Sequence, residues 1–221
     1  LCGTAHYGME FKYQDTPKHI TVIVDGDWSG DSVTCKSTSA GCILHGSHML
    51  ESWSVTQQVI SLSSAESEFY AIGSGCSRGL TVKNVLNELA AMHPGTDAIG
   101  MKVKTGSDAA RGMLHRHGVG RVRHLATSFL WIQAALRDKE FDIERIEGKQ
   151  NPIDIGTKVV DADNLRRSLP RLSVGSLREL GWHIPQTSLT ATLFLIYGST
   201  PTAAVTSMHD PPQCEVKVVM D

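Results

Sequence analysis

The sequence predicts a mixed α/β fold, in which a single sheet carries helices on its faces. Two observations lead to this prediction: three strand-like runs follow one another between residues 20 and 63, and helical and strand-like runs alternate from residue 63 to residue 158. Three adjacent strands favour an antiparallel meander, and the later alternation favours a mixed sheet covered by helices. The expected order of elements is βββαβαα(β)α.

The first strand, ITVIVDG at 20–26, is a continuous β-branched run, typical of a strand buried on both faces. Two more strands are expected within 39–52 and 53–63, with a turn at Gly46 and Ser47 or at residues 50–52. The remaining strands are expected at 98–105 and 140–147.

The longest helix is expected at 63–92, capped by Ser63 or Ser64, and Gly79 predicts a break within it. Shorter helices are expected at 108–118, 122–139, 151–158, 162–172 and 174–182. The chain is expected to comprise a connector at 1–18, a domain at 19–160, and an extension at 161–221 of short helices and a disordered tail.

The composition, 41% hydrophobic and 20% charged residues, is sufficient for a packed core. The net charge of −2 gives no global indication of nucleic-acid binding, so any such indication must be local. Five widely spaced cysteines and the lack of a signal peptide predict reduced thiols in an intracellular protein, cytoplasmic or nuclear. The most apolar stretch, 189–198, is too short to span a bilayer, so no membrane association is expected.

Two acidic residues stand where a carboxylate is costly unless it binds something. Asp25 ends the first strand, although it could also be a turn acid. Glu68 lies within the apolar stripe of the long helix, whereas Glu66 points to the opposite side, toward solvent or the helix N-terminus. The stripe is formed by Ala65, Phe69, Ile72 and Cys76. Glu68 is therefore the candidate that faces the sheet.

Asp154, in NPIDIGTK, is the third candidate, with a first-turn helix acid as the alternative interpretation. Clustered carboxylates on a mixed sheet suggest a site for a hard cation such as Mg²⁺. Asp108, in VKTGSDAARG, follows the fourth strand by a few residues. The residues alone leave open whether Asp108 caps a helix or holds a metal ion.

The segment RGMLHRHGVGRVRH at 111–124, called the basic segment below, contains no acidic residue. Its basic residues are Arg111, Arg116, Arg121, Arg123, His115, His117 and His124. Such a segment suits contacts with nucleic-acid phosphates, and a solvated basic turn is the alternative. The histidines lack the spacing of a zinc site.

Five blocks, in this order, resemble the ribonuclease H domain of copia-type retrotransposon Pol polyproteins. The blocks are DGDWSGD, CKSTSAGCILHGSHMLESWSVTQQVISLSSAESEFYAI, SDAARGM, GRVRHLATSFLWIQ and EGKQNPIDIGTK. The resemblance covers about residues 1–160, since LCGTAHYGMEF also resembles the family's lead-in from the polymerase part. It implies a ribonuclease H-like sheet of three antiparallel strands followed by parallel ones, with helices on both faces. It also implies hydrolysis of the RNA strand of RNA–DNA hybrids with Mg²⁺ or Mn²⁺, and the reverse transcriptase portion of the same polyprotein as a partner.

The resemblance assigns catalytic and metal-binding roles to Asp25, Glu68 and Asp154. It places the family's remaining aspartate on Gly106, so one expected carboxylate is absent. Asp108 then occupies a variable position and is expected to be a helix acid or cap; only a shift in register would make it catalytic. For the hybrid, the expected contacts are Arg111, Arg116, Arg121, Arg123 and His124.

These observations predict a ribonuclease H-type nuclease whose activity is impaired by Gly106. The alternative is a non-catalytic nucleic-acid-binding or structural module with the same fold. A general α/β binding module with no nucleic-acid role is a third interpretation, against which the arginines of the basic segment argue.

Overall fold

The computed structural model describes residues 7–93, 95–120, 124–125 and 127–176. The chain divides into two units, which are described separately. In the smaller unit, β1 (Tyr7–Met9) pairs antiparallel with β7 (Val174–Ser176), with Tyr7 opposite Ser176. The remaining described elements belong to the larger unit, which spans Phe11–Ser173.

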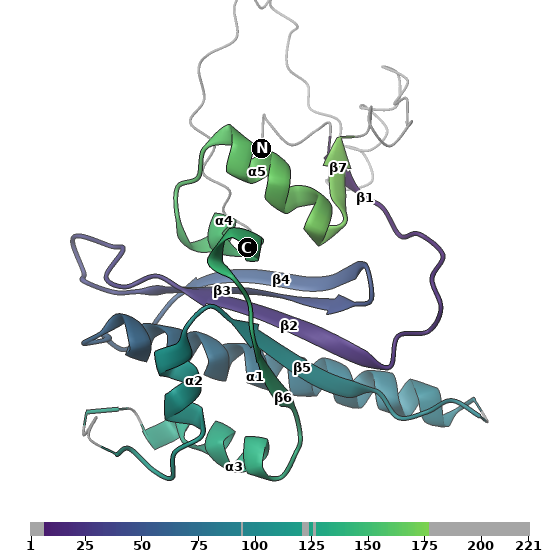
Figure 1. The fold of residues 1–221 in the computed structure, drawn as a ribbon, viewed down its shortest axis with the longest axis horizontal. Helices are drawn as coiled ribbons and strands as arrows, with labels where there is room; N and C mark the ends of the chain where they lie inside the picture. Colours follow the sequence, from purple (N-terminus) through teal and green to yellow (C-terminus); the bar gives the residue numbers. More distant parts are fainter. Residues whose placement is uncertain (1–6, 94, 121–123, 126, 177–221) are drawn as a thin grey trace, which may run out of the picture. The chain divides into compact units, whose positions relative to one another are not determined.

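The larger unit is built on a five-stranded sheet with the order β4-β3-β2-β5-β6 (Figure 1). Its strands are β2 (His19–Gly26), β3 (Thr38–His45), β4 (His48–Thr56), β5 (Gly100–Thr105) and β6 (Asp142–Arg145). β2, β3 and β4 form an antiparallel meander, whereas β5 pairs parallel with β2 and β6 pairs parallel with β5. The predicted mixed five-stranded sheet is confirmed.

The turn between β3 and β4 lies at Gly46 and Ser47, one of the two positions expected. Gly46 has a φ of +63°, a left-handed conformation that glycine adopts without steric cost. The expected division of the strands at residues 52 and 53 is wrong, because β4 runs continuously through both. Trp53 is buried in the middle of β4, with 5% of its surface exposed.

Helix α1 (Ser64–Ala91) is capped by Ser63, whose side chain accepts a hydrogen bond from the Glu66 amide. The expected break near Gly79 is absent, and the helix is continuous for 28 residues. Tertiary packing explains this, because a Cβ at Gly75 or Gly79 would collide with the sheet. The glycines therefore allow a close approach of helix and sheet that outweighs their low helix propensity.

We expect Gly75→Val to lower the free energy of unfolding by about 1–3 kcal/mol, because overpacking displaces neighbouring side chains. A Cβ at Gly75 would lie 2.4 Å from Val24 Cγ1. Urea denaturation would measure the change. Gly112→Ala is the matched control: its Cβ would have no neighbour within 4 Å, so the substitution should stabilise helix α2 by up to about 1 kcal/mol. Equal effects of both substitutions would contradict the packing explanation.

The other helices are short. They are α2 (Asp108–Leu114), η1 (Thr127–Phe129), α3 (Trp131–Arg137), η2 (Gly148–Gln150), α4 (Asp154–Thr157), α5 (Ala162–Ser168) and η3 (Leu169–Leu172). The helices expected at 108–118 and 122–139 are therefore shorter than predicted, and α2 ends before Gly118, whose φ is +73°. At 174–182 the sequence predicted a helix, but its first three residues form β7. The rest of that segment lies outside the described residues.

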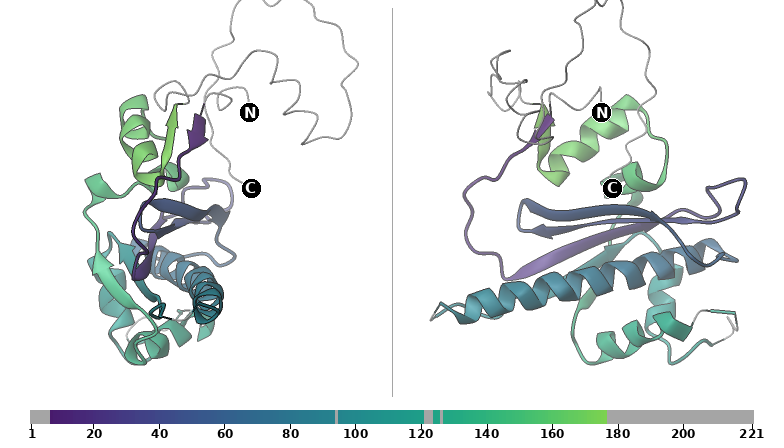
Figure 2. Two further views of the ribbon diagram at one scale, coloured as in Figure 1. Left: turned by 90° about the vertical axis from the view of Figure 1, so that its right-hand side faces the viewer. Right: turned by 180° about the vertical axis from the view of Figure 1, so that it is seen from behind.

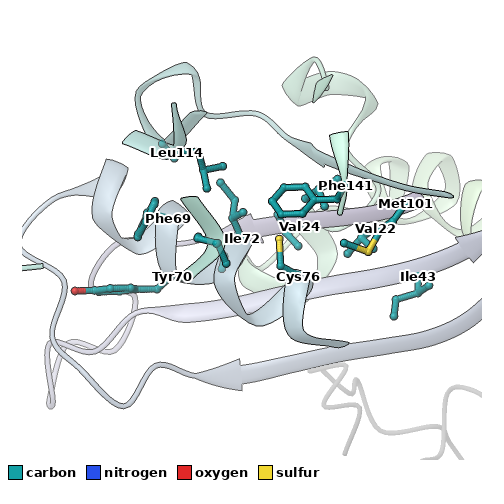
Figure 3. Packing of buried hydrophobic residues seen from close by; sticks show 14 of the residues in the cluster. Val22, Val24, Ile43, Phe69, Tyr70, Ile72, Cys76, Met101, Leu114 and Phe141 are labelled. Carbon is teal, nitrogen blue, oxygen red and sulfur yellow. The ribbon is translucent and has the colours of Figure 1, made fainter. Parts of the chain in front are cut away.

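The helices cover both faces of the sheet. α1, α2 and α3 lie on one face, and α4 and α5 lie on the other (Figures 1 and 2). Figure 3 shows the core under α1, where Phe69, Ile72 and Cys76 face Val24 and Met101. On the other face, α4 approaches β3 and β4 closely, and the Ser54 hydroxyl donates to the Gly156 carbonyl at 2.6 Å.

Three cysteines fall within the described residues, and all three are free thiols. Cys42 and Cys76 are buried and Cys35 is exposed. Burial raises the pKa of the Cys42 thiol to about 12. Among the helices that the structure describes, none has the length and hydropathy needed to cross a membrane. The apolar stretch at 189–198 lies outside the described residues.

Candidate active site

Asp25 stands near the end of β2 and is 5% exposed. Its carboxylate accepts hydrogen bonds from the Thr157 hydroxyl and from Asn151 Nδ2, the latter at 3.4 Å. Lys158 Nζ lies 3.5 Å from Asp25 Oδ2. The carboxylate is thus held by three residues of the 151–158 segment, more than 120 residues further along the chain.

Glu68, in the second turn of α1, lies on the Asp25 side of the helix, as the apolar stripe predicted. The Thr105 hydroxyl donates to Glu68 Oε2 at 3.3 Å. Burial, followed by the charges of Asp25 and Asp154, raises the pKa of Glu68 to about 7, although Thr105 and Lys158 act in the opposite direction. Like charges and a low dielectric therefore keep Glu68 partly protonated near neutral pH.

We expect Glu68→Gln to stabilise the fold at pH 8 by about 1–3 kcal/mol, with a smaller difference below pH about 5. The folded protein keeps the Glu68 proton up to about pH 7, whereas an unfolded chain loses it near the ordinary value of 4.5. The stability of the unmodified protein therefore falls as the pH rises through this window. Thermal melts between pH 5 and 8 would measure the difference.

The control is Glu88→Gln, which removes an exposed glutamate from the far end of the same helix. If Glu68→Gln and Glu88→Gln had the same effect at every pH, like-charge repulsion at Glu68 would be rejected.

Glu66 is buried, with 1% of its surface exposed, so the expectation that it faces solvent is wrong. Its carboxylate accepts from the Leu62 amide at 2.9 Å and from the Tyr70 hydroxyl, and it lies 2.9 Å from His124 Nε2. The contact with Leu62 at the helix N-terminus was one of the two expected environments. The helical periodicity indicates only which residues face the sheet. The residues just before α1 cover the opposite side of this turn, as does His124, and together they bury Glu66.

Asp154 is the first residue of α4, and Lys158 Nζ lies 3.2 Å from its Oδ1. Burial and the charge of Asp25 raise the pKa of Asp154, against the opposing effect of Lys158. Burial acts to lower the pKa of Lys158, but Asp25 and Asp154 outweigh it and raise the pKa. Lys158 therefore acts as the counter-charge of two candidate carboxylates at once.

Four residues around these carboxylates were not singled out from the sequence: Thr105, Asn151, Thr157 and Lys158. Three of them, Asn151, Thr157 and Lys158, lie within NPIDIGTK, so the block itself was the available signal. Asp27 also lies close enough to be affected, because burial and the charge of Asp25 raise its pKa.

Gly106 follows β5 directly, next to Thr105, which bonds Glu68. A Cβ at Gly106 would meet no atom closer than the Ile146 carbonyl at 3.8 Å, an ordinary contact. The position therefore has room for a side chain, and the lack of a carboxylate there is not imposed by packing.

Asp108 is the first residue of α2 and is exposed. It is a helix acid, as expected, but it is not the cap: Ser107 caps the helix by accepting from the Ala110 amide at 3.2 Å. The two carboxylate oxygens of Asp108 pair with Arg111 and with Arg145, each at 2.9 Å. Both carboxylate oxygens of Asp108 are therefore occupied by ion pairs with arginines.

The basic segment is described only in part. Arg111 pairs with Asp108, and His124 contacts Glu66, so both also have partners within the chain. Arg116 is exposed. Arg121 and Arg123 lie outside the described residues.

The carboxylate oxygens of Asp25, Glu68 and Asp154 are ligands of the kind that a hard cation such as Mg²⁺ prefers. The charge of Asp25 raises the pKa of both Glu68 and Asp154, and the charge of Asp154 also raises the pKa of Glu68. A cation would relieve this like-charge repulsion. As the side chains stand, however, no three His, Cys, Asp or Glu residues of the described ranges form a group that could hold a metal ion. The carboxylate set therefore fits a hard cation in kind and charge, and Lys158 is its counter-charge within the chain.

No family model matches the chain. The chain is 26% identical over 137 residues to the retrovirus-related Pol polyprotein from transposon TNT 1-94 of Nicotiana tabacum. The match covers 62% of this chain and 10% of that protein, so the chain spans about a tenth of the length of this relative.

Several solved ribonuclease H structures are also similar. LC11-RNase H1, isolated from compost, is 13% identical, with a TM-score of 0.42 over 63% of this chain and 93% of that chain. The N-terminal RNase H domain of rv2228c from Mycobacterium tuberculosis is 14% identical, with a TM-score of 0.40 over 68% of this chain and 95% of that chain. LC11-RNase H1 in complex with an RNA/DNA hybrid is 14% identical, with a TM-score of 0.36 over 60% of this chain and 88% of that chain.

The strand order, with a meander of three strands continued by two parallel ones, defines a ribonuclease H-like fold. The resemblance to a retrotransposon Pol polyprotein, stated from the sequence blocks, is confirmed by the match to the tobacco transposon protein.

Proposed function

We propose that this chain contains the ribonuclease H domain of a copia-type Pol polyprotein, and that it binds RNA–DNA hybrids but hydrolyses their RNA strand slowly. One observation carries the proposal: the charge of Asp25 raises the pKa of both Glu68 and Asp154, so the three carboxylates share one site, and Gly106 directly follows Thr105, which bonds Glu68. The reverse transcriptase portion of the same polyprotein is the proposed partner.

In this proposal, Asp25, Glu68 and Asp154 would hold Mg²⁺ or Mn²⁺. Such an ion would supply positive charge for the scissile phosphate and lower the pKa of an attacking water. The chain's own contribution is to fix the carboxylates: Thr157 and Asn151 orient Asp25, and Thr105 orients Glu68. Lys158 balances part of their charge, which lets the acidic side chains pack together.

The ion pairs of Lys158 favour a second candidate, a hybrid-binding module without catalysis. An ammonium group bound to Asp25 and Asp154 competes with a metal ion for the same oxygens. Calorimetric titration with Mg²⁺ separates the two candidates. Saturable binding that Asp25→Asn removes supports the nuclease, and no heat of binding in the millimolar range supports the non-catalytic module.

We expect the triple substitution of Arg116, Arg121 and Arg123 by alanine to weaken binding to hybrids of any base sequence by a similar factor. Each phosphate contact that is lost should also reduce the salt slope of the affinity by about 1, so the slope should fall by up to about 3. Fluorescence anisotropy at several salt concentrations would measure both quantities. Arg137→Ala, on the exposed side of α3, is the control. Unchanged affinity and slope in the triple variant would reject the basic segment as a binding surface.

A further inference from the structure

A polar pocket lies beside Asp154, on the face of the sheet opposite the basic segment's helix α2. Its volume is about 200 Å³, below the 300–1,000 Å³ typical of sites for drug-sized ligands, so it suits a group no larger than a phosphodiester. Residues from η2, α4 and α5 line it. Val160 is its one apolar side chain, and Gly148 contributes backbone. The polar lining residues are Lys149, Asn151, Asp154, Asn164, Arg167 and Ser168.

The charges of the pocket favour an anion. Lys149 and Arg167 make no ion pair within the described part of the chain, whereas the single acid, Asp154, is already paired with Lys158. The guanidinium of Arg167 is positioned by two bonds on its own helix, to the Asp163 carbonyl at 3.3 Å and to Asn164 Oδ1 at 2.5 Å. Two cations among amide and hydroxyl donors form the kind of set that recognises phosphate oxygens.

The pocket is connected to the candidate active site. Asn151, which is 5% exposed, lines the pocket and donates to Asp25 Oδ1 at 3.4 Å. Asp154 lines the pocket and is also one of the candidate carboxylates. The backbone of Lys149 is fixed by Arg171, whose Nη1 donates to the Lys149 carbonyl at 3.3 Å. An anion in this pocket would therefore lie next to the carboxylates, at a position set by the fold.

We propose that this pocket binds a backbone phosphate of the nucleic acid next to the scissile bond, with Lys149 and Arg167 as its cationic contacts. The inference rests on the proposed function, because it assumes that the carboxylates face a hybrid. α2 lies on one face of the sheet and α4 and α5 lie on the other (Figure 1), so in this proposal the duplex contacts both. Binding then depends on two separate groups of cations, and only one of them is in the basic segment.

The test uses the full chain with Lys149→Gln and Arg167→Gln combined, which removes both positive charges and leaves polar side chains. Anisotropy with a labelled RNA–DNA hybrid at several salt concentrations should show affinity on the order of tenfold weaker at low salt, and a salt slope reduced by about 2. The control is Arg166→Gln, since Arg166 neighbours Arg167 on α5 but pairs with Asp163 at 3.1 Å and does not line the pocket. The control should bind as the unmodified chain does.

A second arm distinguishes the source of the phosphate. Calorimetry with inorganic phosphate measures whether the pocket takes a free anion. If the double variant loses phosphate binding but binds the hybrid normally, the pocket is a free-phosphate site and our assignment is wrong. If hybrid affinity and slope are unchanged and phosphate does not bind, the assignment is also wrong. Should the double variant fail to fold, Lys149→Gln alone, expected to reduce the slope by about 1, decides the question.

The proposed function can fail independently of the pocket. If the unmodified chain does not bind the hybrid at any salt concentration, both proposals are overturned. If it binds and only the triple arginine variant of the basic segment loses affinity, the proposed function stands and the pocket assignment falls.

Discussion

Replacing Gly106 by aspartate is expected to raise the rate of hybrid hydrolysis by two to three orders of magnitude. A unit charge about 4 Å away contributes about 4 kcal/mol at an effective dielectric of 20, and each tenfold change in rate needs about 1.4 kcal/mol. The position accepts a Cβ at ordinary contact distance, so the new carboxylate requires no repacking. Single-turnover cleavage of a labelled hybrid in Mg²⁺ would measure the gain.

Two controls accompany this substitution. Gly106→Asn adds a side chain of the same shape without a charge, so it should leave the rate low. Asp108→Asn should change little, because the Asp108 oxygens pair with Arg111 and Arg145. A large loss of activity in Asp108→Asn would show instead that Asp108 supplies the third carboxylate and that the alignment at this corner is shifted.

The second large effect concerns Asp25. In the Gly106→Asp background, Asp25→Asn is expected to reduce hydrolysis to the level of the unmodified chain or below it. The substitution removes the charge at a position that is 5% exposed and contacted by Asn151, Thr157 and Lys158. The same cleavage assay measures the loss, and circular dichroism confirms that the variant is folded.

The matched control for Asp25 lies in the same sequence block. Asp31 is exposed, and its carboxylate accepts from the Val33 and Thr34 amides in a turn. Asp31→Asn should therefore leave the rate unchanged. Equal losses from the two substitutions would mean that Asp25 has no special role and that the block as a whole supports the fold.

The sheet and its longest helix were predictable because their signals are local. The β-branched run locates β2 to within one residue, and the alternation in the following segment predicts two more strands, although it placed the boundary between them wrongly. The apolar stripe of α1 identified Glu68 for the same reason, because the helical period relates side chains only a few positions apart. The Gly79 break was wrong because propensity describes an isolated helix, whereas here close packing on Met101 and Val22 requires glycine.

The surroundings of the carboxylates could not be predicted in this way. Nothing in the sequence distinguishes Lys158 from an ordinary surface charge after a helix. Only the contact between β2 and α4 brings it to both Asp25 and Asp154. Glu66 is similar, since His124, 58 residues further along the chain, helps to bury it. Such contacts depend on long-range packing, which residue periodicity does not encode.

We propose that this fold holds three carboxylates of a nuclease site and lacks the fourth at Gly106. The most direct measurement is cleavage of an RNA–DNA hybrid labelled on both strands, by the unmodified chain and by Gly106→Asp in the same Mg²⁺ buffer. We predict little or no product from the unmodified chain, and cleavage of the RNA strand alone by Gly106→Asp. Rapid cleavage by the unmodified chain, with no gain from the added aspartate, would contradict the account.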